Sequence, residues 1–219
     1  TEKDLGLIYL KRANCKLSLE SFKAAIEDLN EAERHDPSLD EIFNNRAYAR
    51  IELGDLKGAI DDIDKAIALN PNEAQMYNNR GDIKFKLLDY KGALSDYEES
   101  VRLKPDYAVS YHNRGNARLQ LGEYEAAIKD YDEAVRLDPQ HVQSFGNRGF
   151  AKLNLKRYEE ALNDYNQAIK LDPKYFGLYT DRGQCKYNLG DKKGACADWK
   201  KAASFGSKVS ADFLKKYCK

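Results

Sequence analysis

Apolar residues recur along this chain with the period of an α-helix, about 3.6 residues. An aromatic residue is followed four places later by a small one, and further along the chain an alanine is followed four places later by a large residue. The arrangement recurs every 34 residues, the spacing also shown by Pro37, Pro71, Pro105, Pro139 and Pro173. A fixed period between roughly 20 and 50 residues indicates stacked structural repeats.

Six repeats follow from this period: residues 6–39, 40–73, 74–107, 108–141, 142–175 and 176–207. Each repeat predicts two helices. The first has an aromatic fourth place and a small eighth place, and the second has alanine at the twentieth place and a large residue at the twenty-fourth. Small residues allow close helix approach, and large ones fill the space beside them. A turn such as Leu53-Gly54-Asp55 separates the two helices, and proline follows the second.

One helix pair cannot bury its apolar face alone, so successive pairs must stack. We therefore predict an all-α fold, an α-solenoid formed as a single array over residues 1–219. Residues 208–218 place apolar side chains on one side of a further helix, which we interpret as a cap on the last repeat.

These features resemble the tetratricopeptide repeat family over residues 6 to about 205, with six copies in one register. The resemblance implies a right-handed, non-catalytic solenoid that binds a peptide or partner segment in its concave groove. Two places depart from the family's pattern: the seventh, normally leucine, is arginine, and the eleventh, normally tyrosine, is basic. Residues 195–202 are similar to the last repeats of many bacterial members, which suggests a bacterial source.

Two charged places are the same in all six repeats, and we predict that they pair. The seventh place holds Arg12, Arg46, Arg80, Arg114, Arg148 and Arg182. The twenty-third place holds Asp28, Asp62, Asp96, Asp130, Asp164 and Asp198. The favoured interpretation is a structural ladder of Arg–Asp pairs between first and second helices, because a buried charge needs a partner. The alternative is a basic groove for an anionic ligand.

Amide side chains follow one face of the first helices. The sixth place of the repeats carries Asn45, Asn79, Asn113, Asn147 and Asp181. Neighbouring places on the same face carry Asn44, Asn78, His112, Tyr48, Asp82, Asn116, Phe150 and Gln184. We name these residues the amide face; in the family it lines the concave side. An amide both donates and accepts, so the row can pair with an extended peptide backbone. It is similar to the asparagine ladder in the repeat domain of the O-linked N-acetylglucosamine transferase. Alternatively the amides bond to one another and fix the stacking, and the two roles are compatible.

Family members that bind the C-terminal carboxylate of chaperones use asparagines together with cations on the first helices. Asn14 and Asn45 match the asparagine places, but the cation places hold Leu10, Gln75 and Asn79. A carboxylate would find no charged partner there, so we reject this ligand.

Composition narrows the choice of partner. The 36 basic and 36 acidic residues give a net charge of zero, which argues against a nucleic-acid partner. No apolar run reaches the roughly 18 residues that a membrane span needs. The first residues also lack a signal peptide, so the cytoplasm is slightly favoured, and the periplasm stays open if a signal sequence was removed.

Catalysis has little support in the sequence. The three histidines are scattered, with His35 in the first repeat and His112 and His141 near opposite ends of the fourth, and no catalytic or phosphate-binding motif is present. We expect no enzyme activity, no cofactor and no bound metal.

The four cysteines, Cys15, Cys185, Cys196 and Cys218, include no CxxC pair, and the favoured interpretation is small buried thiols. A disulfide between two of the last three stays open.

The leading hypothesis is a protein-interaction scaffold that binds a peptide or partner segment in its concave groove. Two alternatives stay open. One is an accessory or assembly subunit of a cell-envelope complex that binds through its convex side or its ends, and the other is the regulatory repeat domain of a larger enzyme. The oligomeric state is not indicated.

Overall fold

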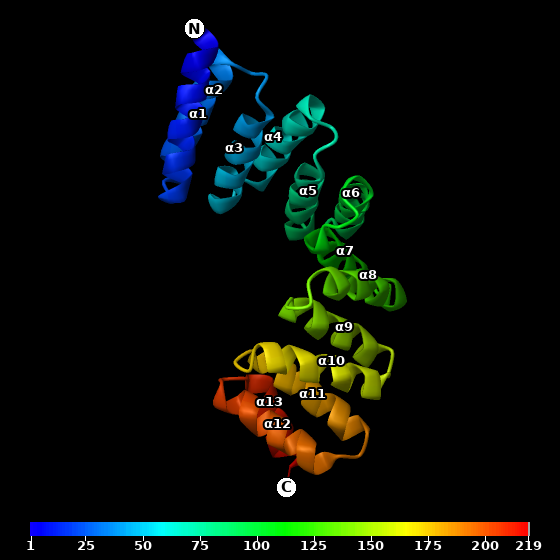
Figure 1. Ribbon diagram of the computed structural model, residues 1–219. Coiled ribbons are helices and arrows are strands. Elements are labelled where there is room, and N and C mark those ends of the chain that lie inside the picture. The colour runs from blue at the N-terminus through cyan, green and yellow to red at the C-terminus, as the bar shows by residue number, and fades with distance from the viewer. Residues whose placement is uncertain (219) are drawn as a thin grey trace. The chain divides into compact units, whose positions relative to one another are not determined.

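The structure is a computed structural model that describes residues 1–218. Thirteen α-helices and no strand occur in that range. The chain divides into two compact units, Thr1–Pro105 and Asp106–Lys219. Each unit is built from successive helix pairs (Figure 1). The all-α solenoid fold predicted from the repeat pattern is confirmed.

Each helix pair corresponds to one predicted repeat. The first unit contains α1 (Glu2–Ser18) with α2 (Phe22–His35), α3 (Asp40–Glu52) with α4 (Leu56–Leu69), and α5 (Ala74–Lys86) with α6 (Tyr90–Leu103). The second unit contains α7 (Ala108–Gln120) with α8 (Tyr124–Leu137), α9 (Val142–Asn154) with α10 (Tyr158–Leu171), α11 (Phe176–Asn188) with α12 (Lys192–Ser204), and then α13 (Lys208–Tyr217). That all six repeats form one array stays a prediction.

Within a unit, the second helix of one pair packs against the first helix of the next pair, as α2 does against α3 and α8 against α9. Neighbouring first helices also touch, as α7 and α11 do with α9. The first helices of a unit therefore form one layer and the second helices another. This arrangement places equivalent side chains of successive repeats next to one another.

The turns between paired helices require a left-handed residue. In three pairs this residue is glycine, namely Gly54, Gly122 and Gly190, with φ of 81°, 78° and 88°. In the other three it is Glu20, Leu88 or Lys156, with φ of 55°, 63° and 60°. A side chain in this conformation costs roughly 1–2 kcal/mol. Half of the turns thus carry local strain that glycine would relieve.

Contact between the helices of a pair depends on matched side-chain size. A Cβ atom added at Gly115 would lie 2.7 Å from Cε1 of Tyr131, which is fully buried. The first repeat instead combines Ala13 with Leu29 in one buried cluster. An aromatic residue at the twenty-fourth place is therefore matched by glycine at the eighth, and an aliphatic one by alanine.

Helix α1 begins at Glu2, four residues before the predicted first repeat at residue 6. The Thr1 side chain accepts a hydrogen bond from the Asp4 backbone N–H, and the Asp4 carboxylate caps the Thr1 backbone in return. This capping box satisfies helix-terminal donors and extends the helix beyond the repeat pattern.

The last helix, α13, packs against α12. The rings of Phe213 and Tyr217 lie 5.1 and 5.9 Å from that of Trp199. A disulfide joins Cys196 of α12 to Cys218, with the two Cα atoms 5.8 Å apart. The end of the second unit is therefore held by aromatic packing and by a covalent bond.

The interpretation of all four cysteines as buried thiols is wrong. Cys196 and Cys218 form the disulfide, because α13 folds back along α12 and brings them within bonding range. Cys15 is an exposed thiol, and Cys185 is a buried one.

Candidate functional site

The Arg–Asp ladder comprises the six arginines of the seventh place and the six aspartates of the twenty-third. In the second repeat, Arg46 donates from Nε to Asp62 Oδ2 at 3.0 Å and from Nη2 to Oδ1 at 2.7 Å. The two side chains are only 4% and 1% exposed. The structure brings together the equivalent Arg and Asp in each of the other five repeats.

Each ladder aspartate also binds the basic residue of the eleventh place. Arg50 Nη1 lies 2.7 Å from Asp62 Oδ2, and Lys152 Nζ lies 2.9 Å from Asp164 Oδ2. Equivalent ion pairs join Lys16 to Asp28, Lys84 to Asp96, Arg118 to Asp130 and Lys186 to Asp198. Sequence reasoning noted this basic place only as a departure from the family and missed its role. Its regular occurrence one helical turn after the ladder arginine was the available signal.

The ladder also connects neighbouring helix pairs. Arg148 Nη1 donates to Asp132 of α8, and Arg182 Nη1 donates to Asn166 of α10, at 2.7 and 2.8 Å. Each ladder arginine further lies over the aromatic ring of the fourth place of its own helix, as Arg148 does at 5.3 Å from the Phe145 centroid. Nitrogen atoms engaged in this way are not offered to a ligand, which favours the structural interpretation over an anion-binding groove.

In the first unit, amides of neighbouring first helices bond to one another. Asn45 Nδ2 donates to Asn14 Oδ1 at 2.7 Å. Asn79 Nδ2 of α5 donates to Asn44 Oδ1 of α3 at 3.1 Å. Both bonds cross from one repeat to the next, so this part of the amide face helps to set the stacking.

Three other residues of the amide face in this unit differ widely in exposure. Asn78 is 2% exposed and donates to Asp82 Oδ2 at 3.3 Å. The Tyr97 hydroxyl donates to Asp82 Oδ1 at 2.7 Å, and burial raises the pKa of the Asp82 carboxyl. Tyr48 is 48% exposed and meets the Phe22 ring edge-on. Tyr48 is thus open to a partner, and Asn78 is not.

In the second unit, Asn116 lies at the centre of a polar network. Its Oδ1 accepts from Asn147 Nδ2 and from the Tyr131 hydroxyl, both at 2.8 Å. The two nitrogens of His112 lie 3.0 Å from Asn116 Nδ2 and 2.8 Å from Ser144 Oγ. Burial lowers the pKa of His112 to about 3, so the ring is neutral near pH 7. Of the remaining predicted residues, Asn113 is half-buried on α7, Phe150 is 40% exposed and Gln184 is exposed.

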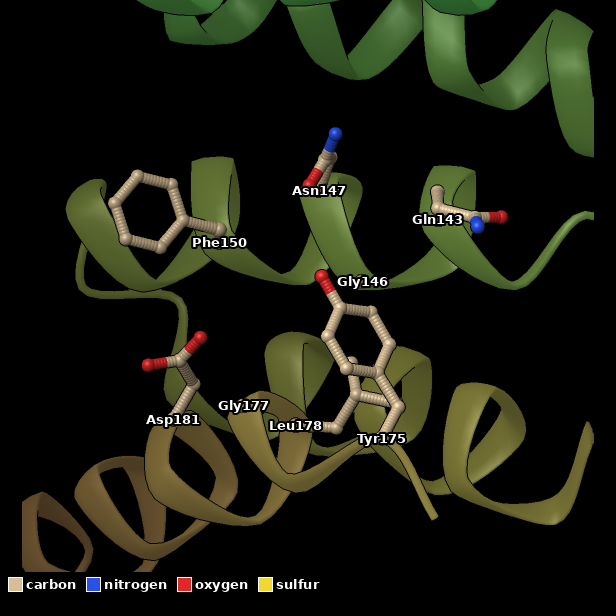
Figure 2. Close-up of a pocket in the computed structure, with 8 residues that line it drawn as sticks. All are labelled: Gln143, Gly146, Asn147, Phe150, Tyr175, Gly177, Leu178 and Asp181. Atoms are coloured by element: carbon tan, nitrogen blue, oxygen red, sulfur yellow. The ribbon is translucent and has the colours of Figure 1, made fainter. Parts of the chain in front are cut away.

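A pocket of about 100 Å³ opens on the amide face between α9 and α11. Its lining is Gln143, Gly146, Asn147, Phe150, Tyr175, Gly177, Leu178 and Asp181. Figure 2 shows the Asp181 carboxylate directed from α11 toward α9, on the same side as Phe150, whereas the ring of Tyr175 reaches toward Gly146 in another part of the pocket. No basic side chain belongs to this lining.

Asp181 accepts no hydrogen bond and forms no ion pair with any residue in the described range 1–218. Burial raises the pKa of its carboxyl to about 6. On α10, the fully buried Tyr165 hydroxyl also has no hydrogen-bond partner among those residues. Sequence reasoning placed Asp181 in the asparagine row and missed both unpaired groups.

The part of the chain that the structure describes contains no group of three or more His, Cys, Asp or Glu side chains that could hold a metal ion. None of its helices combines the length and the apolar character that crossing a membrane requires.

Stacked helix pairs with a polar face along their first helices define an α-helical repeat protein. A tetratricopeptide repeat model matches residues 108–141 and 142–175, a TPR repeat model matches 81–122, and a further tetratricopeptide repeat model matches 4–74. The chain belongs to the tetratricopeptide repeat family. None of the curated proteins gives a significant match.

Solved structures of family members share the fold. Pseudomonas aeruginosa pilF has a TM-score of 0.84 at 17% identity, over 98% of this chain and 99% of its own. YrrB has a TM-score of 0.74 at 20% identity, over 86% of this chain and 97% of its own. MamA from Desulfovibrio magneticus RS-1 has a TM-score of 0.73 at 25% identity, over 80% of this chain and 99% of its own.

Proposed function

We propose that this chain is a protein-interaction scaffold whose amide face binds an extended segment of a partner protein. Tetratricopeptide repeats are in general non-catalytic modules for protein–protein interaction. YrrB, which shares the fold, is described as a TPR protein with an unusual peptide-binding site.

The observation that carries the proposal is the unused hydrogen-bonding capacity of paired amides. The bond from Asn79 Nδ2 to Asn44 Oδ1 leaves the Asn44 amino group and the Asn79 carbonyl oxygen without a partner among the described residues. One donor and one acceptor next to each other match the C=O and N–H groups of an extended backbone. The same amides can therefore fix the stacking and hold a peptide.

Exposed aromatic residues accompany the amides in both units. Tyr48 and Phe150, each at the ninth place of a first helix, are 48% and 40% exposed. A backbone held by amides would bring its side chains onto such surfaces, and buried aromatic contacts supply much of the affinity at protein interfaces.

Affinity capture from native lysate with quantitative mass spectrometry tests the proposal. We expect the double variant Asn44→Ala/Asn79→Ala to lose at least about tenfold of the partners captured by the wild type, since two hydrogen bonds are each worth roughly 1 kcal/mol. The matched control is Asn72→Ala/Asn163→Ala, which removes two exposed amides outside the amide face.

Undiminished capture by the first double variant, at an unchanged melting temperature, would refute binding on the amide face. In that case, partners cross-linked to second helices or to α1 would support an assembly role through the convex side or the ends.

A further inference from the structure

One recurring hydrogen bond is absent from the fifth repeat. In the fourth repeat, the Tyr131 hydroxyl of the twenty-fourth place donates to Asn116 of the ninth place, and the third repeat makes the equivalent bond. In the fifth repeat the ninth place is Phe150, so the buried Tyr165 hydroxyl has no partner among residues 1–218. A buried hydroxyl without a partner is unfavourable, because it has lost its hydrogen bonds to water. This repeat thus tolerates a cost that its neighbours avoid.

The adjacent residue of the amide face, Asp181, is unpaired as well. At the same place of the preceding repeat, neutral Asn147 donates to Asn116 at 2.8 Å. Each ladder aspartate of the second unit binds two cations, whereas half-buried Asp181 binds none within the described chain. A carboxylate removed from water without a cation is unfavourable, so a site built in this way favours a cationic ligand.

The remaining lining of the pocket suits a cation. Phe150 and Tyr175, 40% and 43% exposed, present aromatic rings, and Gln143 and Asn147 present amide groups (Figure 2). A cation over an aromatic face is attracted by the negative potential of the ring. The volume of about 100 Å³ exceeds the space of roughly 10–15 Å³ that one water needs in the same measure, so a guanidinium or ammonium group fits.

We propose that this pocket takes an arginine or lysine side chain of the segment bound on the amide face, with the Asp181 carboxylate as its ion-pair partner. The inference rests on the proposed function and adds a requirement to it: the partner segment carries a basic residue. The bound cation would give Asp181 the partner that every ladder aspartate already has.

The other charged and titratable groups around Asp181 are either neutral near pH 7 or already paired. The Asp181 carboxylate is therefore the charge that a bound cation would meet. The Tyr165 phenol on α10 and the Cys185 thiol on α11 interact with it electrostatically. Burial raises the pKa of both groups, that of Cys185 to about 12, so both are neutral near pH 7. The cations of α9, Arg148 and Lys152, bind the ladder aspartate of α10 instead.

Besides Asp181, the lining of the pocket contains one other side chain with an ionisable group, Tyr175. Because burial raises the pKa of Asp181 to about 6, its carboxyl is largely protonated near pH 5 and largely ionised near pH 7. A ligand that requires the ionised form therefore binds about tenfold more weakly near pH 5.

Selection from a randomised peptide display library, carried out with the wild-type protein and with Asp181→Asn, tests the proposal. Asparagine occupies the same place in four other repeats, so the variant is expected to fold, which circular dichroism checks. We expect the wild type to select peptides with a basic residue at one position, and Asp181→Asn to lose that preference. Glu159→Gln, which removes one exposed negative charge on α10, is the matched control and should keep it.

Fluorescence anisotropy with one selected peptide then measures the ion pair. Replacement of its arginine by citrulline should weaken binding to the wild type about tenfold or more, and binding to Asp181→Asn hardly at all. Peptides selected without a basic residue, or a preference that persists in Asp181→Asn, would overturn the inference and leave the proposed function standing. Selected peptides whose affinity is indifferent to Phe150→Ala, together with undiminished partner capture by Asn44→Ala/Asn79→Ala, would instead refute the proposed function, and the inference with it.

Discussion

The Arg–Asp ladder predicts that the same substitution has different costs at two depths of burial. In the second repeat, Asp62 is 1% exposed and binds Arg46, which is itself 4% exposed. In the first repeat, Asp28 is 4% exposed, but its partner Arg12 is 58% exposed. Asp62→Asn keeps the shape and one acceptor oxygen of the side chain and removes only its charge.

The expected loss of unfolding free energy depends on the surroundings of the arginine that remains after the substitution. Breaking a buried pair costs roughly 3–5 kcal/mol, because the remaining charge stays out of water. Arg46 retains its ion pair with Glu33, which places Asp62→Asn near the lower end, at about 3 kcal/mol. In Asp28→Asn, water can solvate the exposed Arg12, and we expect a loss of about 1 kcal/mol.

Urea unfolding followed by two probes measures this difference. Far-ultraviolet circular dichroism reports on all helices, whereas fluorescence reports on Trp199, the single tryptophan, on α12 of the second unit. Asp62→Asn should lower the midpoint seen by circular dichroism and leave the Trp199 transition nearly unchanged. Equal losses for Asp62→Asn and Asp28→Asn would show that the exposure of the partner arginine does not set the cost of the substitution, and would refute this reasoning.

Three further predictions concern stability. Lys156→Gly should raise the unfolding free energy by about 0.5–1 kcal/mol in urea titrations, because the turn has φ of 60°. Gly115→Ala should lower the melting temperature through a loss of about 2 kcal/mol, since its Cβ would meet Tyr131, whereas Gly177→Ala meets no atom closer than 3.5 Å and should not. Burial raises the pKa of the Asp181 carboxyl to about 6 in the folded state, above the ordinary range of aspartate, so its ionisation destabilises the folded state as the pH rises through that value. Urea titrations should show Asp181→Asn to be more stable than the wild type by about 3 kcal/mol near pH 7, and equally stable near pH 3.

The sequence was sufficient to locate the helix pairs because each repeat carries the same packing residues at the same places. The pairing of Arg46 with Asp62 could be predicted for a related reason: two charged places that recur together six times need each other when buried. The start of α1 at Glu2 could not, since the Thr1 cap lies outside the repeat.

The unpaired Asp181 was harder to foresee. Its place in the asparagine row is visible in the sequence, but its lack of a partner depends on Phe150 and Tyr165, which belong to other helices and meet it only in the fold. The pairing of the last three cysteines could not be predicted for the same reason. It depends on the path of α13, which brings Cys218 next to Cys196.

The disulfide makes the end of the second unit sensitive to its chemical surroundings. A solenoid frays from its termini, because a terminal helix has a neighbour on one side only. The bond closes a loop with a sequence separation of 22 residues, which by chain entropy is worth roughly 3 kcal/mol. Under oxidising conditions the disulfide holds α13 covalently against α12, where it covers the Trp199 ring. Under reducing conditions only non-covalent contacts hold α13, among them the ring contacts of Phe213 and Tyr217 with Trp199, and we expect the helix to detach more readily.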